Sequence, residues 1–89
     1  MANGGFMEKA EVVIYSRTGC HLCEVAENLL DELHANLLFS HERVLIDGDA
    51  ELEYKYGEQV PVITINGKVH DFFRLDPKRF TSAIEELTR

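Results

Sequence analysis

The sequence has little basic charge, because nine lysine and arginine residues stand against sixteen acidic ones and give a formal net charge of −7. A surface of that sign repels phosphate backbones and anionic lipid headgroups. The sequence also has no apolar run approaching the roughly 20 residues that a membrane-spanning helix needs. We therefore expect neither a nucleic-acid partner nor a membrane partner.

Cysteine is scarce as well, since the 89 residues hold two, Cys20 and Cys23. Two cysteines are too few for the disulfide framework of a small secreted domain. Residues 1–8 have neither the basic start nor the apolar stretch of an export signal, and their Asn-Gly-Gly composition predicts a flexible tail. We expect a single domain over residues 9–89 and a cytoplasmic location, where a cycling disulfide is more usual than a permanent one.

The hydrophobic pattern of residues 9–89 predicts an α/β fold. Short β-branched runs predict strands, and apolar residues that recur every three to four positions predict helices. Asn66-Gly67 is typical of a type I′ hairpin turn, and Asp76-Pro77 is typical of a helix start. The expected elements are strand 11–16, helix 20–35, strand 42–47, helix 50–56, strand 60–65, strand 68–73 and a last helix 77–87. This βαβαββα order predicts a mixed sheet in which a right-handed crossover makes the first two strands parallel.

Three details of the first strand and helix are also predicted. The β-branched run Val12-Val13-Ile14 is typical of a strand that is buried on both faces. Leu22 begins an apolar helical face that ends at Leu33, so we expect Leu22 to be buried. Asn36 is typical of a left-handed residue that ends a helix.

The two cysteines lie where the first strand gives way to the long helix. The N–H groups and partial positive charge of a helix amino terminus stabilise a thiolate relative to a thiol. Cys20 comes first and is assigned as the nucleophile. Cys23, one turn later, is within disulfide reach and can release a partner from Cys20. Arg17 and His21 are candidates to add positive charge beside the thiolate.

Pro61 interrupts an apolar strand, where a proline removes a hydrogen bond of the ladder. Only about 5–6% of X-Pro bonds in folded proteins are cis, so sequence alone favours trans. A cis Val60–Pro61 bond would bend the chain and turn the backbone of Val60 toward the cysteine pair. That backbone would then bind an extended peptide or thiol substrate.

These residues, in this order of elements, resemble the thioredoxin fold and most closely the small glutaredoxins and glutaredoxin-like proteins. The resemblance spans about residues 11–87 and is carried by segment 14–23, Val60-Pro61-Val62 and segment 65–68. It implies a sheet of order 2-1-3-4, a cis Pro61, and dithiol–disulfide exchange in which Cys20 attacks. The implied activity is that of an oxidoreductase in electron transfer and cell redox homeostasis, acting on protein or glutathione mixed disulfides.

Three features depart from the usual glutaredoxin pattern. Phe72-Phe73 replaces the glycine pair after the last strand, Gln59 replaces the threonine before valine-proline, and His21-Leu22 replaces the common Pro-Tyr between the cysteines. Arg17 and Arg74 remain candidates to meet a carboxylate of glutathione. We expect glutathione as a co-substrate and no tightly bound cofactor.

Other interpretations of the cysteine pair stay open. A structural zinc site needs four ligands, and the spacing of His34 and His41 fits no common zinc pattern, so no metal site is expected. The thiols can also be two packed core residues. The main alternative to an enzyme is a non-catalytic thioredoxin-fold binding module or an iron–sulfur cluster carrier. The leading hypothesis is a monomeric oxidoreductase whose partners are disulfide-containing proteins or glutathione.

Overall fold

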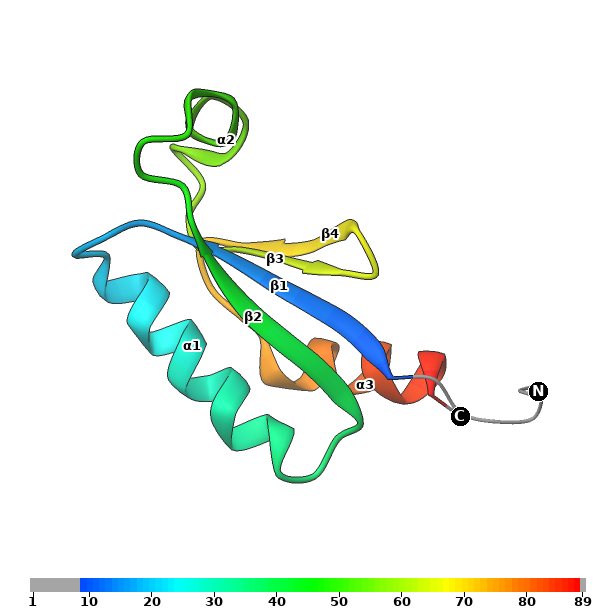
Figure 1. The fold of residues 1–89 in the computed structure, drawn as a ribbon. Coiled ribbons are helices and arrows are strands. Elements are labelled where there is room, and N and C mark those ends of the chain that lie inside the picture. The colour runs from blue at the N-terminus through cyan, green and yellow to red at the C-terminus, as the bar shows by residue number, and fades with distance from the viewer. Residues whose placement is uncertain (1–8, 89) are drawn as a thin grey trace.

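The computed structural model describes residues 9–88, and the flexible tail predicted for residues 1–8 lies outside them. The described chain forms one four-stranded mixed sheet with three helices (Figure 1). The elements are β1 (Ala10–Ser16), α1 (His21–His34), β2 (Phe39–Leu45), α2 (Ala50–Tyr56), β3 (Val62–Ile65), β4 (Lys68–Phe72) and α3 (Pro77–Leu87). The predicted α/β class and element order are confirmed.

The strands lie in the order β2-β1-β3-β4, as the resemblance implied, so β2 and β4 are the two edges of the sheet. β2 runs parallel to β1, whereas β3 is antiparallel to both β1 and β4. The turn Asn66-Gly67 joins β3 to β4 with φ values of 52° and 84°. Positive φ at both residues is the type I′ geometry predicted from the sequence.

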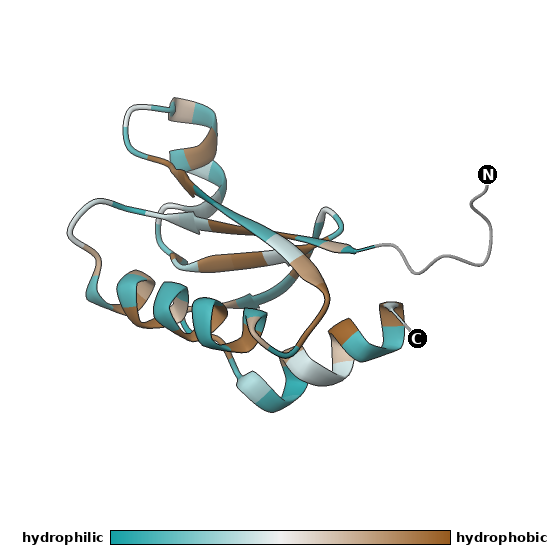
Figure 2. Ribbon diagram, turned by 60° about the horizontal axis from the view of Figure 1, so that its bottom comes forward, coloured by the Kyte–Doolittle hydropathy of each residue, from teal (hydrophilic) through white to brown (hydrophobic). Residues whose placement is uncertain are grey.

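The main hydrophobic core lies between the sheet and two of the helices. In both ribbon views α1 and α3 cover one face of the sheet, while α2 lies on the opposite side beyond one end (Figure 1). Along α1 the hydropathy colour alternates from turn to turn, as expected of a helix with one apolar side (Figure 2). Phe39 and Phe80 are fully buried and meet edge to face at 5.1 Å between ring centroids, which joins β2 to α3.

The burial of β1 and the start of β2 differ from their predictions, and β3 begins at Val62 instead of residue 60. β1 alternates between buried and more exposed residues instead of being buried on both faces. The reason is that α2 is short and covers the second face at one end only, where Tyr56 stacks on Tyr15 at 4.5 Å. β2 begins at Phe39, earlier than the predicted residue 42, because Phe39 is a core residue and pairs with Ala10.

The end of α1 also differs from its prediction. Ala35, the residue after the helix, is its C-cap with φ −65°, and Asn36 does not have a positive φ, so the predicted left-handed conformation of Asn36 is wrong. The backbone N–H of Asn36 donates to the carbonyl of Leu33 at 3.1 Å, which closes a tighter last turn. None of the helices within residues 9–88 has the length and apolar character that crossing a membrane requires.

Candidate active site

Cys20 and Cys23 are joined in a disulfide at the amino end of α1, with their Cα atoms 5.2 Å apart. Cys20 is the N-cap residue, and its Sγ accepts a hydrogen bond from the backbone N–H of Cys23 at 3.2 Å. The two residues differ in access, because Cys20 is partly exposed whereas Cys23 is only 1% exposed. An incoming group therefore reaches Cys20 before Cys23.

The loop before the cysteine pair is fixed by short-range and long-range hydrogen bonds. The N–H of Cys20 donates to the carbonyl of Arg17 at 3.3 Å, and Gly19 between them has φ +74°, a conformation that glycine adopts without strain. The N–H of Thr18 donates to Oδ1 of Asp47, which follows β2, at 3.1 Å. The position of Cys20 is thus set by β1, α1 and the segment after β2.

Arg17, predicted as a cation beside the thiolate, reaches from this loop to the end of α2. Its Nη2 donates to the carbonyl of Gly57 at 2.9 Å, and Gly57 is the C-cap residue of α2. A guanidinium has five N–H donors, so this bond leaves others for a ligand. His21, the other predicted cation, is the first residue of α1 and is exposed.

The Val60–Pro61 bond is cis, as the resemblance implied. Tyr15 of β1 pairs with Val62 of β3, so the same antiparallel register puts Pro61 beside the end of β1, where the redox loop begins. The N–H of Phe73 is shared between the carbonyls of Pro61, at 2.9 Å, and Gln59, at 3.2 Å. The segment after β4 therefore holds the cis-proline segment in place at this end of the sheet.

Leu22 is 51% exposed, so the prediction that it is buried is wrong. The buried side of α1 begins instead with Cys23 and continues through Ala26 and Leu30. Successive residues of a helix are rotated by about 100°, so burial of Cys23 turns its neighbour Leu22 away from the core. Leu22 is therefore an exposed apolar residue between the two cysteines.

Arg74 lies in the loop between β4 and α3 and is exposed. Phe72 and Phe73 precede it, with 44% and 48% of their surface exposed, and their rings meet edge to face at 5.1 Å. Each ring therefore contacts the other while nearly half of each residue stays exposed. Besides the hydrogen bond from the backbone N–H of Arg79, which is the largest cause, the positive charge of Arg74 contributes to lowering the pKa of Asp76. No hydrogen bond joins Arg74 to the cysteine loop in the part of the chain that the structure describes.

Glu27 is a residue near the site that is not among the site residues predicted from the sequence. It is partly buried on α1, one turn beyond Cys23, and its Oε2 accepts a hydrogen bond from the hydroxyl of Ser16 at 2.9 Å. Its Oε1 pairs with Arg43 of β2 at 3.5 Å. The signal that would have found it is the i, i+4 spacing from Cys23, which puts both residues on one side of the helix.

The imidazoles considered as zinc ligands lie elsewhere. His34 is the last residue of α1, at the opposite end of the helix from the cysteines, and its ring is 5.2 Å from that of His41. Over residues 9–88 there is no group of three or more His, Cys, Asp or Glu side chains arranged to hold a metal ion.

Known proteins are similar to this chain, in sequence or in fold, over most of their length. Residues 11–85 match the model of the family described as Glutaredoxin-like domain (DUF836). The uncharacterised protein Mb0520 of Mycobacterium bovis is 26% identical over 87 residues, which cover 92% of this chain and 90% of that protein. The solution structure of protein Ne2328 from Nitrosomonas europaea is 31% identical with a TM-score of 0.78, covering 94% of this chain and 99% of the other.

A more distant likeness concerns the fold alone. The crystal structure of thioredoxin from Malassezia sympodialis is 18% identical and has a TM-score of 0.65, with 94% of this chain and 79% of that chain covered. The sheet order β2-β1-β3-β4 agrees with this fold. The chain has the thioredoxin fold and belongs to the Glutaredoxin-like domain (DUF836) family.

Proposed function

We propose that the protein is a dithiol–disulfide oxidoreductase that reduces protein or glutathione mixed disulfides. The observation that carries this proposal is the contrast between the partly exposed Cys20 at the start of α1 and the 1% exposed Cys23 behind it. Two cysteines with only a packing role would both be expected in the core. One accessible and one protected sulfur is the arrangement that sequential attack requires.

The amino end of α1 supports the assignment of Cys20 as the nucleophile. The N–H of Cys23 is directed at the sulfur of Cys20, and the helix end adds partial positive charge. Both interactions are stronger with a thiolate than with a thiol, so they favour the reactive form in the reduced protein. Each tenfold increase in the ratio of thiolate to thiol corresponds to about 1.4 kcal/mol.

The reaction proceeds in two exchanges. The thiolate of Cys20 attacks one sulfur of a substrate disulfide, forms a mixed disulfide with it, and expels the other substrate sulfur, which takes up a proton. Cys23 then loses its proton and attacks the sulfur of Cys20, which forms the Cys20–Cys23 disulfide and releases the second substrate thiol. Two electrons pass from the protein to the substrate, and the product on the protein is the disulfide seen in the structure.

The groups around Cys20 are proposed to position the substrate. Val60 precedes the cis proline and makes no backbone hydrogen bond with any other part of residues 9–88, so its N–H and carbonyl are open to an extended peptide or thiol. Pro61 fixes the direction of that backbone. Arg17, His21 and Arg74 are the cations offered to a carboxylate of the substrate.

The oxidised protein must be reduced again by a second thiol compound. We propose glutathione for this step, as a co-substrate that binds only transiently and supplies two electrons through two thiols. The proposed setting is the cytoplasm, where the thiol pool is reducing. The protein is proposed to act as a monomer, because each chain supplies both cysteines.

The test is turnover of a peptide–glutathione mixed disulfide with glutathione as the reductant. We expect Cys20→Ser to reduce turnover to the uncatalysed rate. With a disulfide-containing protein as the substrate, we expect Cys23→Ser to release no more than one equivalent of product per molecule of the variant. The variant should accumulate a mixed disulfide at Cys20, which mass spectrometry detects. Alkylation of the reduced wild type should modify Cys20 first, because Cys23 is 1% exposed.

Two results would contradict the proposal. The first is full turnover by Cys20→Ser. The second is a wild-type protein that reduces no disulfide although its own cysteines are shown to be reduced.

A further inference from the structure

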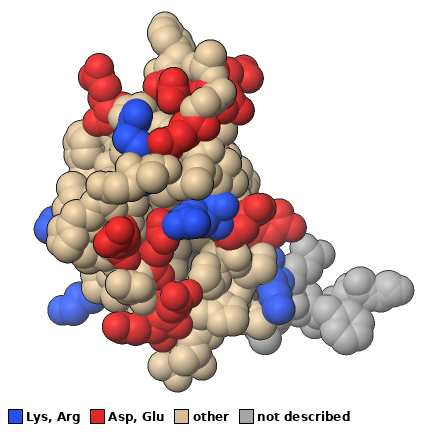
Figure 3. Space-filling model, turned by 60° about the vertical axis from the view of Figure 1, so that its left-hand side comes forward, with Lys and Arg blue, Asp and Glu red and all other residues tan. Residues whose placement is uncertain are grey.

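The net charge of the chain is concentrated in one stretch of the sequence. Residues 17–58 hold ten acidic and three basic side chains, so they carry the whole formal charge of −7. Residues 59–88 hold four acidic and four basic side chains and are neutral overall. The stretch 17–58 comprises the redox loop, α1, β2 and α2, so the negative charge lies on the elements that contain Cys20 or follow it along the chain. Figure 3, in which the left-hand side of Figure 1 comes forward, shows more red than blue groups.

Three exposed carboxylates adjoin the redox loop, and we call them the acidic rim: Glu24, Asp47 and Glu58. Glu24 directly follows the second cysteine on α1. Asp47 is bonded to the loop itself, through its 3.1 Å contact with the N–H of Thr18. Glu58 follows Gly57, whose carbonyl anchors the arginine of the loop. The acidic rim therefore adjoins the redox loop in sequence or through the hydrogen bonds of that loop.

The three cations in the same stretch are each engaged within the fold. Arg17 donates to the Gly57 carbonyl at 2.9 Å. Arg43 pairs with Glu27 at 3.5 Å. Lys55 lies 5.3 Å above the ring of Tyr56. Of the three, only Arg43 is paired with a carboxylate, and the ten acidic side chains of the stretch outnumber its three cations, so the acidic rim keeps a negative potential toward solvent.

Exposed apolar side chains accompany the acidic rim. Leu22, 51% exposed, lies between the two cysteines, and Phe73, 48% exposed, is hydrogen-bonded to the carbonyl of Pro61. Covering such side chains stabilises a complex by roughly 25 cal/mol per Å² of apolar surface removed from water. A polypeptide segment provides the length and the apolar groups to cover them.

We propose that the disulfides reduced at Cys20 belong to polypeptides with lysine or arginine beside the reacting cysteine. This inference rests on the proposed oxidoreductase function and deepens it by naming the substrate class. The acidic rim attracts the basic flanks and speeds encounter, and Leu22 and Phe73 contact apolar residues of the bound segment. The chemistry is the two-step exchange described above, with a polypeptide thiol and its former disulfide partner as the products.

The test uses two peptides that differ only in charge. Each carries one cysteine as a mixed disulfide with the same neutral chromogenic thiol, and the flanking residues are lysine in one peptide and glutamate in the other. Release of the thiol by the pre-reduced protein gives the second-order rate constant for each peptide. We expect the lysine peptide to react about tenfold faster at low ionic strength, with the ratio falling as salt is added.

The variant that tests the acidic rim is Glu24→Gln, Asp47→Asn and Glu58→Gln combined. These changes remove three charges and keep the side-chain shapes, including the acceptor that Asp47 offers to Thr18. We expect the ratio of the lysine-peptide rate to the glutamate-peptide rate to fall at least threefold; because a ratio is compared, any effect of Asp47→Asn on the reactivity of Cys20 itself cancels.

The matched control removes three charges from elsewhere: Glu11→Gln, Glu42→Gln and Glu85→Gln, all exposed. It has the same net charge as the rim variant, and we expect it to keep the wild-type preference.

The outcomes separate this inference from the function on which it rests. If neither peptide is reduced, the oxidoreductase proposal fails. If both are reduced at equal rates at low salt, or if the glutamate peptide is faster, the function stands and the basic substrate class is overturned. If the rim variant keeps the full preference, the acidic rim is not its source and the inference is likewise overturned.

Discussion

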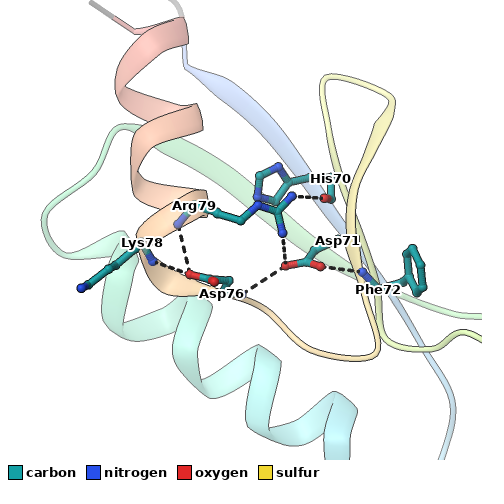
Figure 4. Close-up of polar contacts among 6 residues, drawn as sticks. All are labelled: His70, Asp71, Phe72, Asp76, Lys78 and Arg79. Carbon is teal, nitrogen blue, oxygen red and sulfur yellow. Dashed lines mark hydrogen bonds and ion pairs between the residues drawn. The ribbon is translucent and has the colours of Figure 1, made fainter.

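Asp71 of β4 forms an ion pair with Arg79 of α3, with 3.3 Å between Oδ2 and Nη1 (Figure 4). The Asp71 carboxylate, 15% exposed, also accepts the backbone N–H groups of Phe72 at 3.1 Å and of Asp76 at 3.2 Å. Asp76 in turn caps α3, and the bond from the backbone N–H of Arg79, followed by that of Lys78, lowers the pKa of Asp76 despite some desolvation. One carboxylate therefore connects β4, the following loop and the start of α3.

We expect Asp71→Ala to lower the free energy of unfolding by about 2 kcal/mol, because it leaves N–H groups of the loop without their acceptor. Asp71→Asn keeps an acceptor oxygen but loses the charge, and we expect it to cost about half as much. Urea denaturation of the two variants, followed by far-UV circular dichroism, measures both values. An alanine variant no less stable than the asparagine variant would show that the hydrogen bonds to the loop contribute nothing.

His70 directly precedes Asp71 in β4. It lies at the register shift between β3 and β4, because its neighbours Val69 and Asp71 pair with the consecutive residues Thr64 and Ile63. Its Nε2 is buried and has no hydrogen-bond partner among the residues that the structure describes. Burial, and secondly the charge of Arg79, lower the pKa of His70, while Asp71 and Asp76 act in the opposite direction. The folded protein therefore favours the neutral imidazole.

The depressed pKa of His70 predicts a loss of stability as the pH falls. The unfolded chain takes up a proton on this residue near pH 6.5, whereas the folded chain resists it, so the stabilising effect is full above about pH 6.5 and declines below it. His70→Leu removes this titration and the unsatisfied nitrogen. We expect the free energy of unfolding of the variant to match or exceed that of wild type at about pH 7.5. The difference in favour of the variant should be larger at about pH 5, as measured by urea denaturation at both pH values. A stability difference that does not change with pH would contradict the assignment.

The bond from Arg17 to Gly57 predicts that these two positions are energetically coupled. A Cβ added at Gly57 would collide with the backbone carbonyl of Glu53 and would lie 3.1 Å from Nη2 of Arg17. We expect Gly57→Ala to cost about 1–3 kcal/mol of unfolding free energy through this overlap. Arg17→Met should cost about 1 kcal/mol through the lost hydrogen bond.

The double variant tests the coupling directly. Because Gly57→Ala already displaces the acceptor of Arg17, the combined loss should be smaller than the two single losses together by at least about 0.5 kcal/mol. Simple additivity in a denaturation cycle would mean that the bond does not contribute to stability.

Much of the fold followed from local pattern, because the relevant forces act over a few residues. The turn at Asn66-Gly67 and the start of α3 at Asp76-Pro77 depend on backbone preferences that the sequence states directly. The start of β2 did not follow, since Phe39 joins the strand through pairing with β1 and packing on Phe80, which are contacts distant in sequence.

The redox pair was predictable from the sequence, and its surroundings only in part. The place of Cys20 at the N-cap of α1 follows from one strand–helix junction. The exposure of Leu22 depends on which sulfur takes the buried side of the helix, and helical periodicity alone put Leu22 inside. The i, i+4 spacing from Cys23 indicates the side of the helix on which Glu27 lies, but its partner Ser16, like the partner Gly57 of Arg17, belongs to a separate element and is signalled by no local pattern.

The two edges of the sheet carry features that discourage another chain from extending it. β2 exposes Glu42 and Arg43, and β4 begins with the exposed Lys68 and has an irregular register near its middle. Charged side chains and bulges on edge strands hinder the addition of a strand from another molecule. These features therefore oppose the edge-to-edge strand pairing that leads to aggregation. An incoming polypeptide is therefore directed away from the sheet edges and toward the end of the molecule that carries the cysteine pair.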